Sequence, residues 1–270
     1  MLILIFLAIV PLLSFVALLT SVQTRLILPA RVNSVDAPDP ALGAEYISIP
    51  TTDGNTLHGI LFAPKSGKAE TLILAFPGNT HNPVGFATFL KTKVFPEENT
   101  AIAALSYRGY PNGITPPSTG TPSQKAMYED SLTVYDTLAT RLKPTEVKVV
   151  GYSIGTSVAT YLATQRKVQK LALLAPFASI RRLAQGKYPW LPVTLLLRHP
   201  FPTEDLIPAL TMPTTIIYSP TDGLIPEAHV TQILHGISPS IPLIAVPNTS
   251  HNTLVLAPEI PRLIRNALLP

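Results

Sequence analysis

Residues 147–155 read Val147-Lys148-Val149-Val150-Gly151-Tyr152-Ser153-Ile154-Gly155. A short run typical of a buried strand comes first, and a run rich in small residues, typical of a helix, follows over residues 154–165. Glycines two positions before and two after Ser153 let the backbone turn sharply and lift the serine hydroxyl clear of the sheet. The pattern predicts a nucleophilic serine. The alternative is a structural Gly-Ser turn between a strand and its crossover helix.

Short apolar runs recur on both sides of this stretch. Two strands, at residues 46–49 and 57–62, flank an Asp53-Gly54 turn and predict a hairpin. Runs that are apolar on both faces suit a parallel sheet covered by helices; they lie at residues 71–76, 101–105, 147–150, 171–174, 214–218 and 243–246. Helices are expected between them, at residues 84–93, 123–142, 154–165, 226–234 and 258–268. The sequence therefore predicts an α/β domain over residues 45–270, with a mostly parallel sheet and helices on both faces.

Composition narrows the function classes. The chain has 270 residues, which suits one domain with a sizeable core. It has no cysteine, which excludes disulfides, thiol nucleophiles and cysteine metal sites. Its net charge is +4, but only 13% of residues are charged and no basic stripe is visible, so no nucleic-acid partner is expected.

The N-terminal residues form a long apolar run. Residues 1–20 carry no charged side chain, and about 20 apolar residues match the thickness of a bilayer core. We expect a single-pass membrane anchor over residues 1–24 and a linker over residues 25–44. A cleaved signal peptide is the alternative, although no basic residue precedes the run. Arg25 and Arg31 follow the run, which favours a cytoplasmic catalytic domain by a small margin.

A long segment, residues 177–213, interrupts the alternation of strands and helices. Since it leaves the sheet after the strand at 171–174, it should lie over the carboxyl ends of the strands, where such sheets bind ligands. We expect a cap insertion over the active site, in which Tyr188 and Trp190 contact substrate and set a preference for longer acyl chains. The alternative is a helical excursion that packs on the core.

A serine nucleophile needs a base and a carboxylate to orient that base. In this kind of sheet their order is serine, acid, histidine. Asp222 follows the strand at 214–218 and His251 follows the last strand, so both should lie at the same sheet edge as Ser153. The loop after residues 71–76 offers the N–H of Asn79 as an oxyanion donor beside that of Ile154. The other candidates are less well placed: His81 as a substrate contact, His199, Glu204 and Asp205 in the cap, and His229 and His235 on the surface of a helix.

Several motifs together resemble the α/β-hydrolase superfamily, in particular its Bem-like, membrane-tethered group, often labelled serine aminopeptidase-like. The resemblance covers about residues 45–265 and rests on Phe76-Pro77-Gly78-Asn79, Tyr107-Arg108-Gly109-Tyr110, Gly151-Tyr152-Ser153-Ile154-Gly155, Ala175-Pro176-Phe177-Ala178-Ser179, Thr221-Asp222-Gly223 and Ser250-His251-Asn252. It implies that Ser153 is the nucleophile, Asp222 the acid and His251 the base, with the N–H groups of Asn79 and Ile154 as the oxyanion hole. Pro77 departs from the family, which usually has histidine there.

The resulting expectation is a membrane-tethered serine hydrolase that cleaves an ester, a thioester or an amide of a small-molecule or acylated substrate. It would form an acyl-enzyme and would need no metal or organic cofactor. Two alternatives stay open at this point. One is a catalytically silent scaffold or binding protein with the same fold, and the other is an acyltransferase that uses the same acyl-enzyme.

Overall fold

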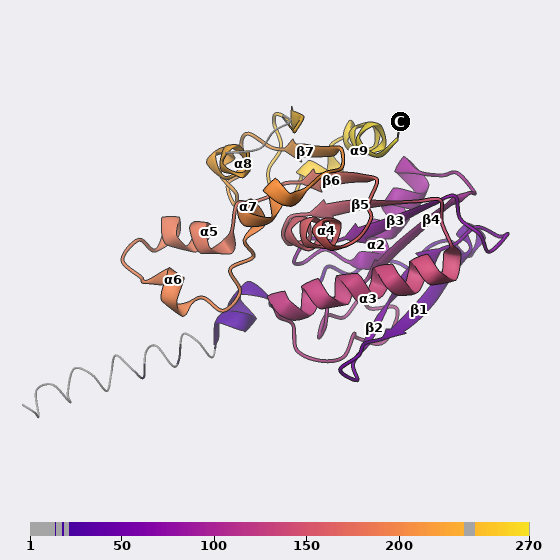
Figure 1. Cartoon of the computed structure of the whole chain (residues 1–270), viewed down its shortest axis with the longest axis horizontal. Helices are drawn as coiled ribbons and strands as arrows, with labels where there is room; N and C mark the ends of the chain where they lie inside the picture. The colour runs from indigo at the N-terminus through magenta and orange to yellow at the C-terminus, as the bar shows by residue number, and fades with distance from the viewer. Residues whose placement is uncertain (1–13, 15–17, 19–21, 235–240, 270) are drawn as a thin grey trace, which may run out of the picture.

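The structure is a computed structural model that describes residues 14, 18, 22–234 and 241–269. Over these residues, one sheet of eight strands has the order β1-β2-β4-β3-β5-β6-β7-β8 (Figure 1). The strands are β1 (Ala44–Pro50), β2 (Thr56–Phe62), β3 (Thr71–Phe76), β4 (Thr100–Leu105), β5 (Glu146–Tyr152), β6 (Lys170–Leu174), β7 (Thr214–Tyr218) and β8 (Leu243–Ala245). β1 and β2 pair antiparallel, β2 joins β4 antiparallel, and β3 to β8 are mutually parallel. The expected hairpin and parallel sheet are thus confirmed.

Helices cover both faces of the sheet. They are α2 (Pro83–Phe89), α3 (Gln124–Leu142), α4 (Ile154–Gln165), α5 (Ile180–Lys187), α6 (Val193–Leu196), α7 (Thr203–Leu206), α8 (Glu227–Ile233) and α9 (Ile260–Leu268). Single turns of other helix types are η1 (Pro40–Leu42), η2 (Leu90–Val94), η3 (Ile207–Ala209) and η4 (Leu254–Leu256). The helix expected at 84–93 is therefore divided into α2 and the π-helical η2.

Alternation along each strand builds two cores. In β3, Leu72 and Leu74 belong to the core that also contains side chains of α3, α4 and α8, whereas Ile73 and Ala75 belong to the core on the other face, with side chains of α2 and α9. Successive side chains of a strand point to opposite faces, so a run that is apolar throughout supplies both cores at once. This arrangement leaves the carboxyl ends of the parallel strands free to carry loops, and the site lies there.

The predicted membrane anchor, residues 1–24, falls mostly outside the described residues. None of the helices in the described part of the chain is long and apolar enough to cross a membrane. Residues 22–27 are helical, and the predicted linker lies partly against the domain. Leu28 is only 1% exposed, and the N–H of Asn33 donates to the carbonyl of Thr80 at 2.9 Å.

The segment expected to form a cap divides into two parts. Its second half, with α7 and η3, packs into the core through Phe201 and Ile207. Its first half, with α5 and α6, projects beyond the sheet and lies beside the start of the described N-terminal helix (Figure 1). There Trp190 is 72% exposed and Leu195 is 85% exposed. One half thus behaves as a packed excursion and the other half as a projection.

Candidate active site

Ser153 lies at the tip of a sharp turn between β5 and α4, with φ 52° and ψ −120°. This conformation is strained for a residue with a side chain, and the surrounding glycines make it possible. A Cβ added to Gly155 would lie 2.1 Å from the carbonyl oxygen of Phe76, and one added to Gly151 would lie 2.5 Å from the carbonyl oxygen of Gly155. The glycines at 151 and 155 are therefore required by close backbone approach.

The three residues expected to form a triad are in contact. The Oγ of Ser153 lies 2.8 Å from Nε2 of His251, and Nδ1 of His251 lies 2.7 Å from Oδ2 of Asp222. A carboxylate can only accept, so the Nδ1–H donates to Asp222 and leaves Nε2 free to accept from the serine hydroxyl. All three residues are nearly buried, at 9%, 7% and 7% exposed for Ser153, His251 and Asp222.

Asp222 is held in its ionised form. Burial pushes its pKa upward, but hydrogen bonds from His251 and from the N–H groups of Ile225 and Leu224 outweigh burial and place the pKa below its usual value. Both backbone donors reach Oδ1 at 2.8 Å, which leaves Oδ2 for the histidine. The carboxylate is thus charged at neutral pH and oriented by its own loop.

Two further rings pack behind the histidine. The hydroxyl of Tyr152 donates to the carbonyl of His251 at 2.5 Å, and the two rings stack with centroids 5.6 Å apart. On the other side, His81 meets Tyr152 edge to face at 4.6 Å. Burial, and secondarily the proximity of His251, lowers the pKa of His81 to about 4, so this histidine is neutral near pH 7. Its predicted contact with substrate stays a prediction.

The loop that carries Asn79 is fixed from three directions. The Tyr107 hydroxyl donates to the carbonyl of Pro77 at 2.8 Å, and the Tyr110 hydroxyl donates to Oδ1 of Asn79 at 2.6 Å. The side-chain amide of Asn79 donates to the carbonyl of Ile27 at 2.7 Å. These contacts give Tyr107 and Tyr110 of the Tyr-Arg-Gly-Tyr motif a definite task, which is to hold the loop.

Two backbone N–H groups are candidates for an oxyanion hole. Within the described loops, the N–H of Asn79 is not used in any backbone hydrogen bond. Ile154 is the first residue of α4, so its N–H has no carbonyl one turn earlier in the helix to bond. Both groups are therefore available to a ligand, as the sequence predicts, while their catalytic role stays a proposal.

The remaining acids and histidines lie elsewhere. Glu204 is paired with Arg182, and Asp205 lies 3.9 Å from Arg181, both within the cap segment. His229 is half-buried on α8, and His235 lies outside the described residues. Of these groups in the described chain, none is hydrogen-bonded to Ser153 or His251.

His199 is buried although it lies in a loop of the cap. Its Nε2 lies 2.8 Å from Oγ1 of Thr24, and its Nδ1 accepts a long hydrogen bond of 3.4 Å from the N–H of Gln124. The reason is tertiary, because the N-terminal segment covers it. Thr24 is 175 positions away in the chain, and no local pattern could reveal that contact.

Arg108, from the Tyr-Arg-Gly-Tyr motif, supports the sheet rather than the site. Its guanidinium donates to both carboxylate oxygens of Asp130 on α3, from Nε to Oδ2 at 2.9 Å and to Oδ1 at 3.2 Å, and from Nη2 to Oδ1 at 2.6 Å. It also pairs with Asp53 in the β1–β2 turn. The ion pairs therefore join the antiparallel hairpin to a helix of the parallel part. Arg108 is therefore a buttress of the fold.

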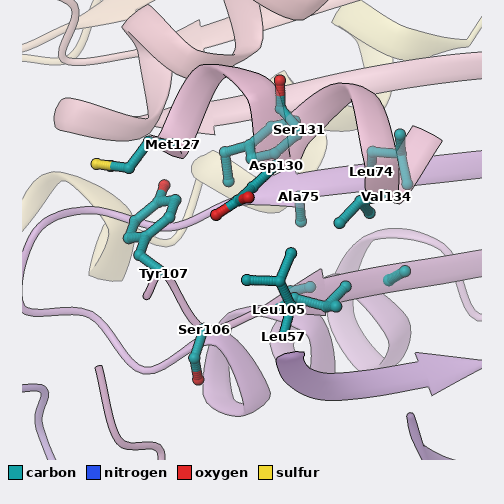
Figure 2. Close-up of a pocket in the computed structure, with 13 residues that line it drawn as sticks. Leu57, Leu74, Ala75, Leu105, Ser106, Tyr107, Met127, Asp130, Ser131 and Val134 are labelled. Carbon is teal, nitrogen blue, oxygen red and sulfur yellow. The ribbon is translucent and has the colours of Figure 1, made fainter. Parts of the chain in front are cut away.

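Two cavities in the described part of the chain differ in volume and in what they could hold. Figure 2 shows the smaller one, an internal cavity of about 20 Å³ between the sheet and α3, with Tyr107 and Asp130 among its lining residues. That is room for about one water molecule and no substrate. The larger pocket, of about 390 Å³, lies between the N-terminal segment and the cap and includes Tyr188 in its lining. Trp190, the other predicted substrate contact, does not line it.

Among the residues that the structure describes, no group of three or more His, Asp or Glu side chains is arranged to hold a metal ion. The candidate site therefore consists of the triad, the two N–H groups and the neighbouring pocket. Sequence reasoning missed the pocket residues that precede the first strand, Gln23, Leu26 and Ile27.

Sequence comparison finds relatives but no matching family model. An uncharacterized protein of Mycobacterium tuberculosis is 27% identical over 235 residues, which cover 86% of this chain and 81% of the relative. Alpha/beta hydrolase domain-containing protein aho-3 of Caenorhabditis elegans is 29% identical over 160 residues, 58% of this chain and 46% of that protein. Lysophosphatidylserine lipase ABHD12 of Mus musculus is 26% identical over 232 residues, 74% of this chain and 56% of the lipase.

Solved structures share the fold. An alpha-beta hydrolase from Vibrio vulnificus superposes with a TM-score of 0.71 over 93% of this chain and 94% of that one, at 17% identity. An esterase from Pyrococcus furiosus superposes with a TM-score of 0.64 over 88% of this chain and 95% of that one, also at 17% identity. The expected α/β-hydrolase fold is thus confirmed. The comparisons do not show whether the chain belongs to the Bem-like group of that superfamily.

Proposed function

Taking the chain as a member of the α/β-hydrolase superfamily, we propose that it is a serine hydrolase that cleaves a carboxylic ester or thioester. The observation that carries the proposal is the continuous hydrogen-bonded chain from Asp222 through His251 to Ser153, with contacts of 2.7 and 2.8 Å. A structural Gly-Ser turn has no need of a buried histidine oriented by an ionised carboxylate. The same contacts argue against the silent-scaffold alternative.

Each group then has one task. The Oγ of Ser153 attacks the carbonyl carbon while Nε2 of His251 takes its proton, and Asp222 stabilises the imidazolium that forms. The N–H groups of Asn79 and Ile154 donate to the oxyanion of the tetrahedral intermediate. The intermediate collapses to an acyl-enzyme, and the leaving alcohol or thiol departs with the proton from His251. A water molecule, deprotonated by His251, releases the acid and restores Ser153.

The substrate class is narrowed by the relatives. Esterases share the fold, and a lysophosphatidylserine lipase shares 26% of aligned residues, although the chain spans only 56% of that lipase. An ester is therefore the favoured substrate, and an amide, which has a poorer leaving group, is not. Residues 1–20 match the length of a membrane anchor, whereas Gln23 and Thr24, which the sequence assigns to the anchor, are bonded to the cap. We therefore include in the proposal a single-pass membrane tether that ends before residue 22, with the catalytic domain on the cytoplasmic side.

A fluorophosphonate probe tests the proposal directly, because it reacts with a serine that has both a base and an oxyanion hole. Full-length protein should be labelled at Ser153, and Ser153→Ala should abolish both labelling and ester turnover while the circular dichroism spectrum is kept. Ser66→Ala, in an exposed turn, serves as the matched control. Folded wild-type protein that neither labels nor turns over esters would support the scaffold alternative instead. Product analysis with an added alcohol then separates hydrolysis from acyl transfer.

A further inference from the structure

The pocket of about 390 Å³ has an unusual wall. One side is formed by the cap, with Tyr188, Leu191 and Leu196 among its lining residues. The other side is formed by Gln23, Leu26 and Ile27, which precede the first strand of the sheet. Residues 23–27, which the sequence assigns partly to the anchor and partly to the linker, therefore form one wall of the pocket.

Hydrogen bonds fasten the two walls together. The side-chain amide of Gln23 donates to the carbonyl of Leu196 at 3.0 Å, and its Oε1 accepts from the N–H of Arg198 at 2.7 Å. Thr24 adds its contact with His199 at 2.8 Å. Because Gln23 both donates to and accepts from the cap backbone, the spacing between the walls is set by its side chain.

The pocket is joined to the candidate site through one residue. Ile27 lines the pocket, and its backbone carbonyl accepts the hydrogen bond from the side chain of Asn79 at 2.7 Å. Asn79 is the residue whose N–H would contact the oxyanion. Ser153 and His251 do not line the pocket themselves, so a substrate would place its reacting carbonyl at Ser153 and its remote part beyond Asn79.

The lining selects an apolar ligand. It carries no ionisable group other than the Tyr188 phenol, and the amide of Gln23 is already bonded to the cap. A volume of this size lies in the range of small-molecule sites. Each methylene moved from water into such a pocket should strengthen binding by about fourfold.

We infer that this pocket binds the acyl chain of the substrate, and that Gln23, Leu26 and Ile27 are specificity-determining residues of the active site. The inference rests on the proposed function, since it needs an acyl-enzyme at Ser153. It adds that the chain-length preference is set jointly by the cap and by the N-terminal segment, through Ile27 and its contact with the Asn79 loop. This inference does not need Trp190, which is exposed and outside the pocket, and the predicted contact of Trp190 with substrate stays a prediction.

The test fills the pocket from each wall separately. Ile27→Trp and Leu196→Trp are made in the full-length protein, with Leu195→Trp as the control, because Leu195 is adjacent in sequence but 85% exposed and outside the lining. For each protein, kcat/KM is measured with the 4-nitrophenyl esters of acetic and octanoic acid. We expect the octanoate-to-acetate ratio to fall by about tenfold or more in both pocket variants, and by less than about twofold in the control.

A second variant covers the case in which tryptophan prevents folding. Ile27→Ala enlarges the pocket without touching the backbone carbonyl, and it should raise the ratio of dodecanoate to octanoate turnover. Unchanged chain-length ratios in the variants of both walls, or an equal fall in Leu195→Trp, would overturn the inference. Failure of the proposed function looks different, because wild-type protein would then neither label with a fluorophosphonate nor hydrolyse either ester.

Discussion

The two halves of the candidate site differ in how firmly the fold holds them. The catalytic residues lie at the carboxyl edge of the sheet, whereas the pocket lies between the cap and the N-terminal segment. Ser153, Asp222 and His251 each follow a strand of the sheet and are at most 9% exposed. In the cap, the whole of α5 buries none of its residues, and Leu195 is 85% exposed. The main core therefore fixes the catalytic side chains, whereas the elements that bound the pocket contribute little to that core. Selectivity can change in such an arrangement without loss of the fold.

The largest effect is expected for the catalytic residues at the edge of the sheet. Ser153→Ala and His251→Ala should each lower kcat by about 10⁶-fold, and the double variant should be no worse, because the two residues act as one unit. Ester turnover and thermal unfolding measured together separate lost chemistry from lost fold. Additive losses in the double variant would mean that the residues do not share a step.

Asp222→Asn should follow, with a loss of about 10⁴-fold in kcat, since an amide favours the wrong histidine tautomer. Asp205→Asn changes an exposed side chain on α7 of the cap, and as the matched control it should retain wild-type turnover. The comparison with Ser153→Ala shows how much of the rate depends on orienting His251. An active Asp222→Asn enzyme with an inactive Asp205→Asn enzyme would reverse the acid assignment.

The Arg108 ion pairs test the main core without touching the chemistry. Arg108→Ala leaves Asp130 buried and unpaired, and burial already raises the pKa of that carboxyl. We expect the free energy of unfolding to fall by about 3–5 kcal/mol. Arg166→Ala removes an exposed pair with Asp136 and should cost about 0–1 kcal/mol in the same urea titration. Equal effects would show that the Arg108 network is not a buttress.

The smallest effect concerns pH and His81. Its pKa is lowered from 6.5 to about 4 in the folded protein, so between these values the unfolded chain binds a proton that the native protein does not. The stability that the native protein gains by keeping His81 neutral is fully present above about pH 6.5 and is lost as the pH falls towards 4. Wild type should therefore lose more stability than His81→Gln between pH 7 and 4.5, by about 1–2 kcal/mol after allowance for partial exposure. Urea midpoints at the two pH values measure the difference, and parallel losses would contradict it.

Much of the sheet edge could be predicted from sequence, for local reasons. Runs that are apolar on both faces define β3 to β7 within about two residues of their ends, which is the usual scatter of such boundaries. The glycines at 151 and 155 mark the turn because no other residue fits there. Asp222 and His251 follow from their places after strands, since the carboxyl ends of parallel strands meet at one edge.

The pocket could not be predicted, because its contacts join distant parts of the chain. Gln23 and Leu196 are 173 positions apart, and Asn79 bonds a backbone carbonyl, which carries no sequence signal. The two halves of the cap are also hard to tell apart from sequence. Both are apolar and proline-rich, yet Phe201 is buried in the core while Trp190 is exposed. Only the packing of the sheet decides between these outcomes.

The carbonyl of Ile27 also bears on where a shortened enzyme should begin. A protein trimmed to start at Ala44, the first residue of β1, would keep every described strand and the whole triad. It would lack the acceptor for Asn79 and the N-terminal wall of the pocket. For expression and crystallisation, trimming should therefore stop at Val22, so that the apolar residues 1–21 are removed and the helical residues 22–27 are kept. A recombinant protein cut later would have a complete sheet and an incomplete active site.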